Sequence, residues 1–346
     1  MGVGDFANPA VFSYVALSKE ATFGTYASAS TAIEAISCSF MTTIKHQKID
    51  AMFASRSHYR QVRLEKEVKG TLEQYLHPQE SVLLLANVLA GQISSTAATN
   101  STLHSISAGN FQNSIAALSF NVRKGGAAGN PATAALTYRY QGGRCNSLKM
   151  VADVGQPVKV SYDFIFQDST QVSDDISNIL SLSSIQPFTF VGGTYKYGSS
   201  EGSLSQENIT HFEMTINNNL VDGKEARALG TNTIMVLPAT KRDIMLKTTQ
   251  RFDTTTIWQR FIQATEGSIE LSFSGAAIVA GTTASEYFFT MQMRLPRVVP
   301  QSGDVALKSS KDILSADIEW DVLIDTPSTS TGRDIGLTIR NSTASY

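Results

Sequence analysis

The chain has 346 residues, of which 42% are hydrophobic and 17% are charged, and its formal net charge is −2 at neutral pH. This length favours two domains of ordinary size over one large domain, and the balanced charge argues against a protein that binds polyanions tightly. No apolar run approaches the roughly 18 residues of a membrane-spanning helix, and residues 1–9 lack the basic start and apolar stretch of a secretion signal. We therefore expect a protein without a membrane anchor that is made and assembled in the cytosol, or that leaves it without a secretion signal.

Short strands dominate the first half of the chain. A strand candidate at Val11–Leu17 is followed by strand-like patterning over Ile33–Ile44. Residues 118–122 and 136–140 alternate apolar and polar side chains on either side of a turn-forming stretch, which is typical of half-buried antiparallel strands. The last strand of this half, Val158–Phe166, alternates in the same way.

One helix is expected within the first half, over Glu80–Ala90. Pro78 stands at its start, where a missing backbone N–H does no harm, and Glu80 in the first turn favours the helix dipole. Apolar residues then recur at helical spacing until Gly91, a residue that commonly ends helices.

The second half repeats this order of elements. A strand at Phe212–Ile216 precedes a long polar loop and a helix over Asp253–Ala264. Alternating residues 269–273 and 289–295 follow as a hairpin, and a strand at Ile318–Ile324 closes the half. Because the same order occurs twice, the sequence predicts an internal duplication.

The predicted fold is mainly β, with two tandem antiparallel domains that resemble a β-sandwich or β-barrel. Each domain carries one flanking helix and a long loop. We place the first domain at residues 1–175 and the second at residues 176–346. The Ser- and Thr-rich end, residues 326–346, is expected to be either a flexible tail or a strand that pairs only with a neighbouring subunit.

Basic residues gather in the long polar stretch before the first helix. They could contact a phosphate backbone, but the stretch has no interleaved aromatic residues for base stacking apart from Tyr59. The favoured interpretation is a solvated hairpin whose charges meet acidic partners on another subunit. The residues are Lys45, Lys48, Arg56, Arg60, Arg63, Lys66 and Lys69.

Residue patterns that carry chemistry are missing from the sequence. Cys38 and Cys145 are the only cysteines, and their spacing suits neither a metal site nor a disulfide framework, so free thiols are expected. The five histidines form no zinc-binding spacing, and there is neither a nucleophile elbow nor a phosphate-binding loop. No catalytic, cofactor-binding or metal-binding residue is predicted, and an enzyme is the least supported class.

Three segments of the chain resemble the major tail tube proteins of tailed phages. The first is VALSKEATFG at Val15–Gly24, and the second is VRLEKEVKGTLE at Val62–Glu73 with the helix ESVLLLANVLAG at Glu80–Gly91. The third, Gly142–Asp168, ends the first half. The resemblance covers about half of the chain directly and the rest through the internal repeat.

The resemblance implies a β-sandwich with a flanking helix and a loop that reaches the adjacent ring of a tube. Carried onto this chain, the long loops are Lys45–Arg63 and Asn217–Thr240, and the basic residues become inter-ring contacts. A two-domain member would close a ring from three chains with pseudo-sixfold symmetry. The implied partners are other copies of the chain, the tape-measure protein and genomic DNA in the lumen, and the tail-tip and tail-terminator proteins.

The sequence therefore predicts a structural virion protein of the tail, a tail tube subunit with no cofactor and no catalysis. Another tail or baseplate component of the same fold is one alternative. A carbohydrate-binding β-sandwich adhesin is a second, but it would need exposed aromatic residues, whereas Trp258 and Trp320 lie on predicted core faces. A depolymerase would need paired carboxylates at the rim of one groove.

Overall fold

Antiparallel strands make up most of this protein. The computed structural model describes residues 13–50, 57, 58, 60–108, 117–124, 136–172, 182–252, 255–279, 288–305, 314–326 and 332–346. Strands account for 59% of the structure and helical residues for 7%, so the predicted mainly-β fold is confirmed.

The first half contains eleven strands and one α-helix among the residues that the structure describes. The helix, α1 (Ser81–Val88), follows the longest hairpin of this half. The strands are β1 (Tyr14–Lys19), β2 (Thr31–Ile33), β3 (Ala35–Cys38), β4 (Met41–Ile49), β5 (Arg60–Tyr75), β6 (Ile93–Ala97), β7 (Thr102–Ser107), β8 (Leu118–Lys124), β9 (Leu136–Asp153), β10 (Lys159–Phe166) and β11 (Asp168–Val172).

In its described part, the second half contains one α-helix, α2 (Thr255–Ile262), and two short 3₁₀ turns, η2 (Phe190–Gly192) and η3 (Lys224–Ala226). Its strands are β12 (Gly193–Gly198), β13 (Ser205–Glu207), β14 (Ile209–Asn217), β15 (Asp243–Arg251), β16 (Gly267–Ala277), β17 (Phe288–Val305), β18 (Ser315–Leu323) and β19 (Gly336–Asn341).

Strand pairing follows the same order in the two halves. In the first half the order is β3/β4–β5–β10–β9–β8–β1–β2, antiparallel throughout. In the second half it is β14–β15–β18–β17–β16–β12–β13, again antiparallel. The helices α1 and α2 take the same place, after β5 and β15. The division into domains at residue 175 stays a prediction.

The strands predicted to close each half occupy equivalent places in this order. Tyr162 in β10 lies opposite Leu72 of β5 and Leu148 of β9. Trp320 in β18 lies opposite Leu246 of β15, and its other neighbour is β17. Both aromatic side chains are fully buried, so each strand presents its large residue to the core.

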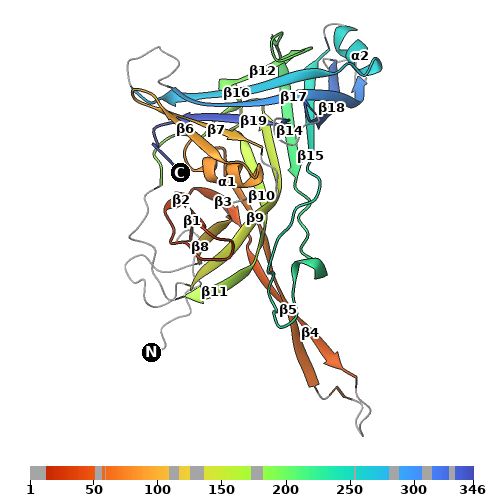
Figure 1. Ribbon diagram of the computed structural model, residues 1–346. Coiled ribbons are helices and arrows are strands. Elements are labelled where there is room, and N and C mark those ends of the chain that lie inside the picture. Colours follow the sequence, from red (N-terminus) through yellow and green to blue (C-terminus); the bar gives the residue numbers. More distant parts are fainter. Residues whose placement is uncertain are drawn as a thin grey trace, which may run out of the picture.

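The two halves share one continuous sheet. The end of β9 pairs with β14, from Ser147 opposite Asn217 to Asp153 opposite His211. In Figure 1, β5, β9, β14 and β15 run along the height of the molecule, while β6, β7, β16, β17 and β19 cross it near the top. Most of the buried apolar side chains of both halves form one contact cluster, and a smaller cluster joins Ile165 to residues of the segment between β14 and β15.

Aromatic rings fill the centre of the first half. Phe40 packs edge-on against Phe120, Tyr140, Phe164 and Phe166, with ring centroids between 4.7 and 6.0 Å apart. Such pairs contribute about 0.5–1.5 kcal/mol each beyond the burial of their area. The alternation read from the sequence therefore corresponds to a real core face.

Helix α1 is buried on all sides, in agreement with its apolar sequence. Glu80 precedes the helix and is itself buried, and its carboxylate accepts the backbone N–H groups of Glu34 (2.8 Å) and Ser183 (3.3 Å). Burial raises the pKa of Glu80. None of the helices among the described residues is long and apolar enough to span a bilayer.

Helix α2 differs from the expectation for its apolar face. Trp258 is 36% exposed and Ile262 is 62% exposed, so the prediction that Trp258 belongs to the core is wrong. Trp320, in contrast, is in the core as predicted. Helix α2 is amphipathic in sequence, but the rest of this chain covers only part of its apolar face.

The predictions for the C-terminal residues 326–346 are also wrong. The segment contains β19, which pairs with β17 and with β7 of its own chain. The alternating Leu337 and Ile339 are buried, and the Asn341 side chain lies 2.9 Å from the His104 ring. Residues 336–341 are therefore neither a free tail nor a strand that pairs only with a neighbouring subunit.

Candidate assembly surfaces

A two-stranded ribbon projects from the body of the protein. It consists of residues 45–49 of β4 and residues 60–64 of β5, all of which are exposed, and it forms the lower end of the molecule in Figure 1. Ile49, Val62 and Leu64 are each between 41% and 45% exposed. Because an isolated two-stranded ribbon is marginally stable in water, the β4–β5 ribbon is a candidate contact surface for another protein.

Lys45, the first of the predicted contact residues, is paired within its own hairpin. Its ammonium group lies 3.2 Å from the Glu65 carboxylate and also contacts Glu67. The hydrogen bond from Lys45 lowers the pKa of the Glu67 carboxyl. Acidic residues of β5 thus neutralise part of the basic charge of this stretch, since they pair with Lys45 of β4.

Lys66 and Lys69 are also paired within the chain. The Lys66 ammonium donates to the Asp168 carboxylate and to the Ser169 carbonyl oxygen (2.5 Å), and only 14% of its side chain is exposed. Lys69 forms an ion pair with Asp222. These two lysines connect β5 to β11 and to the loop between β14 and β15, which lie far away in the sequence.

The remaining predicted contact residues lie on the β4–β5 ribbon or near its tip. Lys48, Arg60 and Arg63 are exposed, and Arg56 lies outside the described residues. Lys48 and Arg63 form no ion pair with the residues that the structure describes. The role of the basic residues in contacts between rings stays a prediction. The exposed residues Lys48, Arg60 and Arg63 of the β4–β5 ribbon are the strongest candidates for these contacts.

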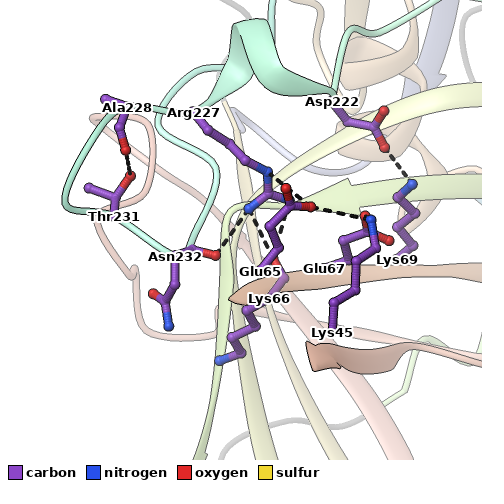
Figure 2. Close-up of polar contacts among 10 residues, drawn as sticks. All are labelled: Lys45, Glu65, Lys66, Glu67, Lys69, Asp222, Arg227, Ala228, Thr231 and Asn232. Atoms are coloured by element: carbon purple, nitrogen blue, oxygen red, sulfur yellow. Dashed lines mark hydrogen bonds and ion pairs between the residues drawn. The ribbon is translucent and has the colours of Figure 1, made fainter. Parts of the chain in front are cut away.

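A long loop of the second half, residues 218–242, lies against β5 (Figure 2). The Arg227 guanidinium donates to the carbonyl oxygens of Asn232 (3.0 Å) and Lys66 (3.4 Å), and the Lys66 backbone N–H donates to the Asn232 carbonyl (2.9 Å). Figure 2 shows Arg227 reaching across the loop towards Glu65 and the edge of β5. Nothing local in the sequence indicates which backbone groups Arg227 contacts, so this contact could not be predicted from the sequence.

Replacing Arg227 with Ala is expected to loosen this loop. The Lys66 and Asn232 carbonyls would lose a charged donor, at a cost of about 1–2 kcal/mol. Hydrogen–deuterium exchange should become roughly tenfold faster over residues 224–236 and stay unchanged in β10. An Arg227→Lys variant retains the charge without the guanidinium fork and should fall in between. Equal exchange in all three proteins would contradict the role of Arg227.

One face of the shared sheet is polar along both halves. Its carboxylates are matched with lysines or hydroxyls on neighbouring strands. Exposed ion pairs of this kind contribute little to stability. The charged and hydroxyl side chains of this face are those of a surface in contact with water. Its ion pairs are Lys159–Glu73 (3.0 Å), Lys149–Glu213 (2.9 Å) and Lys247–Glu319 (2.5 Å).

A cavity of about 310 Å³ lies between the halves, where η2, β12 and β14 meet. Phe190, Phe212 and Phe273 line it, together with a single carboxylate, Glu207. Glu207 is engaged by Arg260 at 2.7 Å. Among the described residues, no group of three or more His, Cys, Asp or Glu side chains could hold a metal ion.

A comparison with known families now supports the sequence resemblance. Residues 13–322 match the family model of the phage tail tube protein, a range that extends from β1 to β18 and includes the β4–β5 ribbon and both α-helices. No curated protein matches the chain. The matched range is most of the chain. The chain therefore belongs to the phage tail tube protein family, and it is a structural protein of the virion tail that self-assembles into a tube.

Proposed function

We propose that this chain is the major tail tube subunit, and that three copies close into a ring with pseudo-sixfold symmetry. Stacked rings would form the hollow conduit through which DNA leaves the virion. The observation that carries the proposal is the shared order of strand pairing in the two halves, because it makes one chain equivalent to two neighbouring positions of a ring.

Unpaired strand edges support closure of such a ring. In the described part of the chain, β3 and β4 pair only with β5, which leaves one edge of these strands open. Open edges invite pairing with another chain, and a heterologous contact that repeats around an axis closes a ring. The pairing of β9 with β14 is one such contact, made within the chain.

The polar sheet face suits the lumen of this conduit. Its carboxylates, among them Asp163, Glu213 and Asp321, repel DNA phosphates. Its lysines are matched with acids on neighbouring strands. A duplex would therefore pass without the release of counterions that drives tight binding. We place the tape-measure protein and the genome in this lumen, and the tail-tip and tail-terminator proteins at the two ends of the tube, with assembly in the host cytoplasm.

The β4–β5 ribbon suits the contact between successive rings. It extends beyond the body of the subunit (Figure 1), and it combines exposed apolar residues with Lys48, Arg60 and Arg63. Apolar area supplies affinity on burial, and the basic groups would select an acidic surface on the next ring.

Electron microscopy with a mass measurement tests the proposal. The purified protein, before and after concentration, should form rings or tubes with a central hole in negative stain. Native mass spectrometry of single rings should give three chains. Rings of six chains would retain the tube role and overturn the threefold count, whereas persistent monomers that bind a saccharide would overturn both.

A further inference from the structure

We propose that neighbouring chains of the ring join through a defined register, in which Met41 of one chain lies opposite Val299 of the next. The end of β17 would pair with β3 and the start of β4, as the end of β9 pairs with β14 inside each chain. The inference rests on the proposed ring, and it specifies the surface that closes it.

The contact within the chain serves as the template. Residues 147–153 of β9 pair with residues 211–217 of β14 along one edge, and residues 147–151 pair with β10 along the other. At the end of this ladder Asn217 lies opposite Ser147. A half-to-half junction of this fold is therefore an antiparallel ladder with a known register.

Shared partners transfer this register to the chain-to-chain contact on the β17 side. Ser147 of β9 lies opposite Asp163 of β10, which follows the buried Tyr162. Val299 of β17 lies opposite Asp321 of β18, the residue that follows the buried Trp320. Val299 thus takes the place of Ser147.

The same transfer identifies the residue on the other strand. Asn217 of β14 lies opposite Asp243 of β15, and Met41 of β4 lies opposite Lys69 of β5. Leu246 of β15 lies opposite Trp320 as Leu72 of β5 lies opposite Tyr162. Asp243 and Lys69 each precede that leucine by three residues, so they are equivalent. Met41 therefore takes the place of Asn217.

Both edges required for this contact are open. Among the described residues, 299–305 of β17 pair only with β18, since β16 reaches no further than Val298. Met41 is 64% exposed although it is apolar. The ladder between β17 and β18 shifts register between Pro300 and Ser302 of β17. The pair at Val299 lies before this irregularity, so it is the one that the template defines best.

Exposure of the two helices gives independent support. The same number of residues separates Leu72 from Leu84 and Leu246 from Trp258, so Leu84 of α1 and Trp258 of α2 are equivalent. Leu84 is fully buried, whereas Trp258 is 36% exposed. By the same offset, the fully buried Val88 of α1 corresponds to Ile262 of α2, which is 62% exposed.

The second half supplies the cover at the end of α1. The Asn218 side chain donates to the Val88 carbonyl (2.8 Å), and Arg242 donates to the Leu89 carbonyl (3.2 Å). In a ring, the first half of the next chain would stand in this relation to α2. The exposed face of Trp258 and Ile262 would then be buried.

The two kinds of junction in the ring are related but unequal. Strands β6 and β7 follow α1 as a hairpin, and β7 pairs with β19 of the second half. Only residues 263–266 separate α2 from β16, so the second half has no such hairpin between its helix and the next strand. The junction between chains is therefore the smaller of the two.

Disulfide cross-linking tests the register. Met41→Cys with Val299→Cys places two thiols on directly opposed residues, whose Cβ atoms lie about 4.5–5.5 Å apart in an antiparallel pair. A small adjustment of the two strands brings them to the roughly 3.5–4.5 Å of a disulfide. Oxidised rings of the double variant should give dimers and trimers on non-reducing gels, and the ladder should end at the trimer. Burial raises the pKa of the Cys38 thiol to about 11 and that of Cys145 well above its usual value, so the native thiols contribute little background at pH 8.

A shifted pair provides the matched control. Thr43→Cys with Val299→Cys moves one exposed thiol two residues along β4, which is about 7 Å, so cross-linking should be roughly tenfold slower. Rings that cross-link only through the shifted pair, or through neither pair, would overturn the register while the tube function stands. A protein that forms no rings at all would count against the proposed function instead.

Fluorescence of the unmodified protein gives a second readout. Trp258 and Trp320 are the only tryptophans, and Trp320 is already buried in the single chain. Assembly should therefore shift the emission to shorter wavelength and reduce quenching by acrylamide, and both changes should be absent in Trp258→Phe. Rings with unchanged emission would overturn the burial of α2.

Discussion

Tubes are expected to be absent, and the subunit to stay folded, when residues 48–61 are replaced by Asn-Gly. Gln47 lies opposite Val62 in the ladder of β4 and β5, so a two-residue turn of this type closes the shortened hairpin with the correct twist. The removed segment includes Lys48, Arg56, Arg60 and the exposed Ile49. If the β4–β5 ribbon joins successive rings, the variant should stop at single rings.

Electron microscopy and thermal unfolding together check this expectation. The Tm of the unassembled variant should lie close to that of the parent, because substitutions at exposed positions usually change stability by about 0.5 kcal/mol or less. The variant Lys48→Ser with Arg60→Ser and Arg63→Ser removes positive charge but keeps the length of the ribbon. It therefore separates the effect of charge on tube formation from the effect of ribbon length. Tubes of normal length in the shortened variant would remove the ribbon from the contact between rings.

A lysine outside the ribbon gives the matched control for that experiment. Lys149→Ser removes one basic charge from the polar sheet face, where Lys149 is paired with Glu213 at 2.9 Å. It should leave tube length unchanged if stacking depends on the ribbon. Equal shortening of tubes by both changes would indicate a general effect of net charge.

Local patterns in the sequence were sufficient for the elements of the core. Period-two alternation identified β10 and β18, because each strand has one face in the core and one in solvent. Helical spacing identified α1 and α2 to within a few residues at each end. The repeat of these elements along the chain was also visible, since it depends only on their order.

Contacts between distant segments could not be predicted in the same way. Trp258 was assigned to the core because it lies on the apolar side of a helix, but the sequence does not show how much of that side the chain itself covers. Leu337 and Ile339 alternate as a strand does, yet the strand that receives them, β7, precedes them by more than half of the chain. Pairing partners are a property of the folded sheet.

The basic residues illustrate the same limit on the candidate site. Their number is plain in the sequence, but strand register decides which of them are neutralised. Lys45 meets Glu65 because β4 and β5 pair, and Lys66 meets Asp168 because β11 begins beside β5. Only after these pairs are known can Lys48 and Arg63 be told apart from the basic residues that are neutralised within the chain.

The largest loss of stability is expected for Glu20→Gln. The Glu20 side chain is 2% exposed, and its carboxylate accepts the Gly24 N–H (2.8 Å), the Ser119 hydroxyl (2.6 Å) and the Gly142 N–H (2.7 Å). An amide supplies one acceptor oxygen, so its NH₂ group must face a buried donor. Loss of one charge-assisted hydrogen bond together with an unsatisfied donor costs about 3 kcal/mol.

Calorimetry of unassembled subunits measures this loss. A cost of about 3 kcal/mol corresponds to a fall in Tm of roughly 4 °C for a chain of 346 residues. Glu73→Gln is the matched control, because it makes the same chemical change at a partly exposed ion pair with Lys159, where an effect of about 0.5 kcal/mol is expected. Equal Tm values for the two variants would contradict the role of Glu20.

This prediction also concerns the origin of the family resemblance. Gly24 and Gly142 have φ values of +76° and +67°, and a Cβ atom on either would collide with the Gln167 side chain. The segments Val15–Gly24 and Gly142–Asp168 therefore meet where Glu20 holds two left-handed turns. If Glu20→Gln destabilises the subunit as expected, these segments resemble tail tube proteins because they build the subunit, whereas the contacts between subunits depend on β17, α2 and the β4–β5 ribbon.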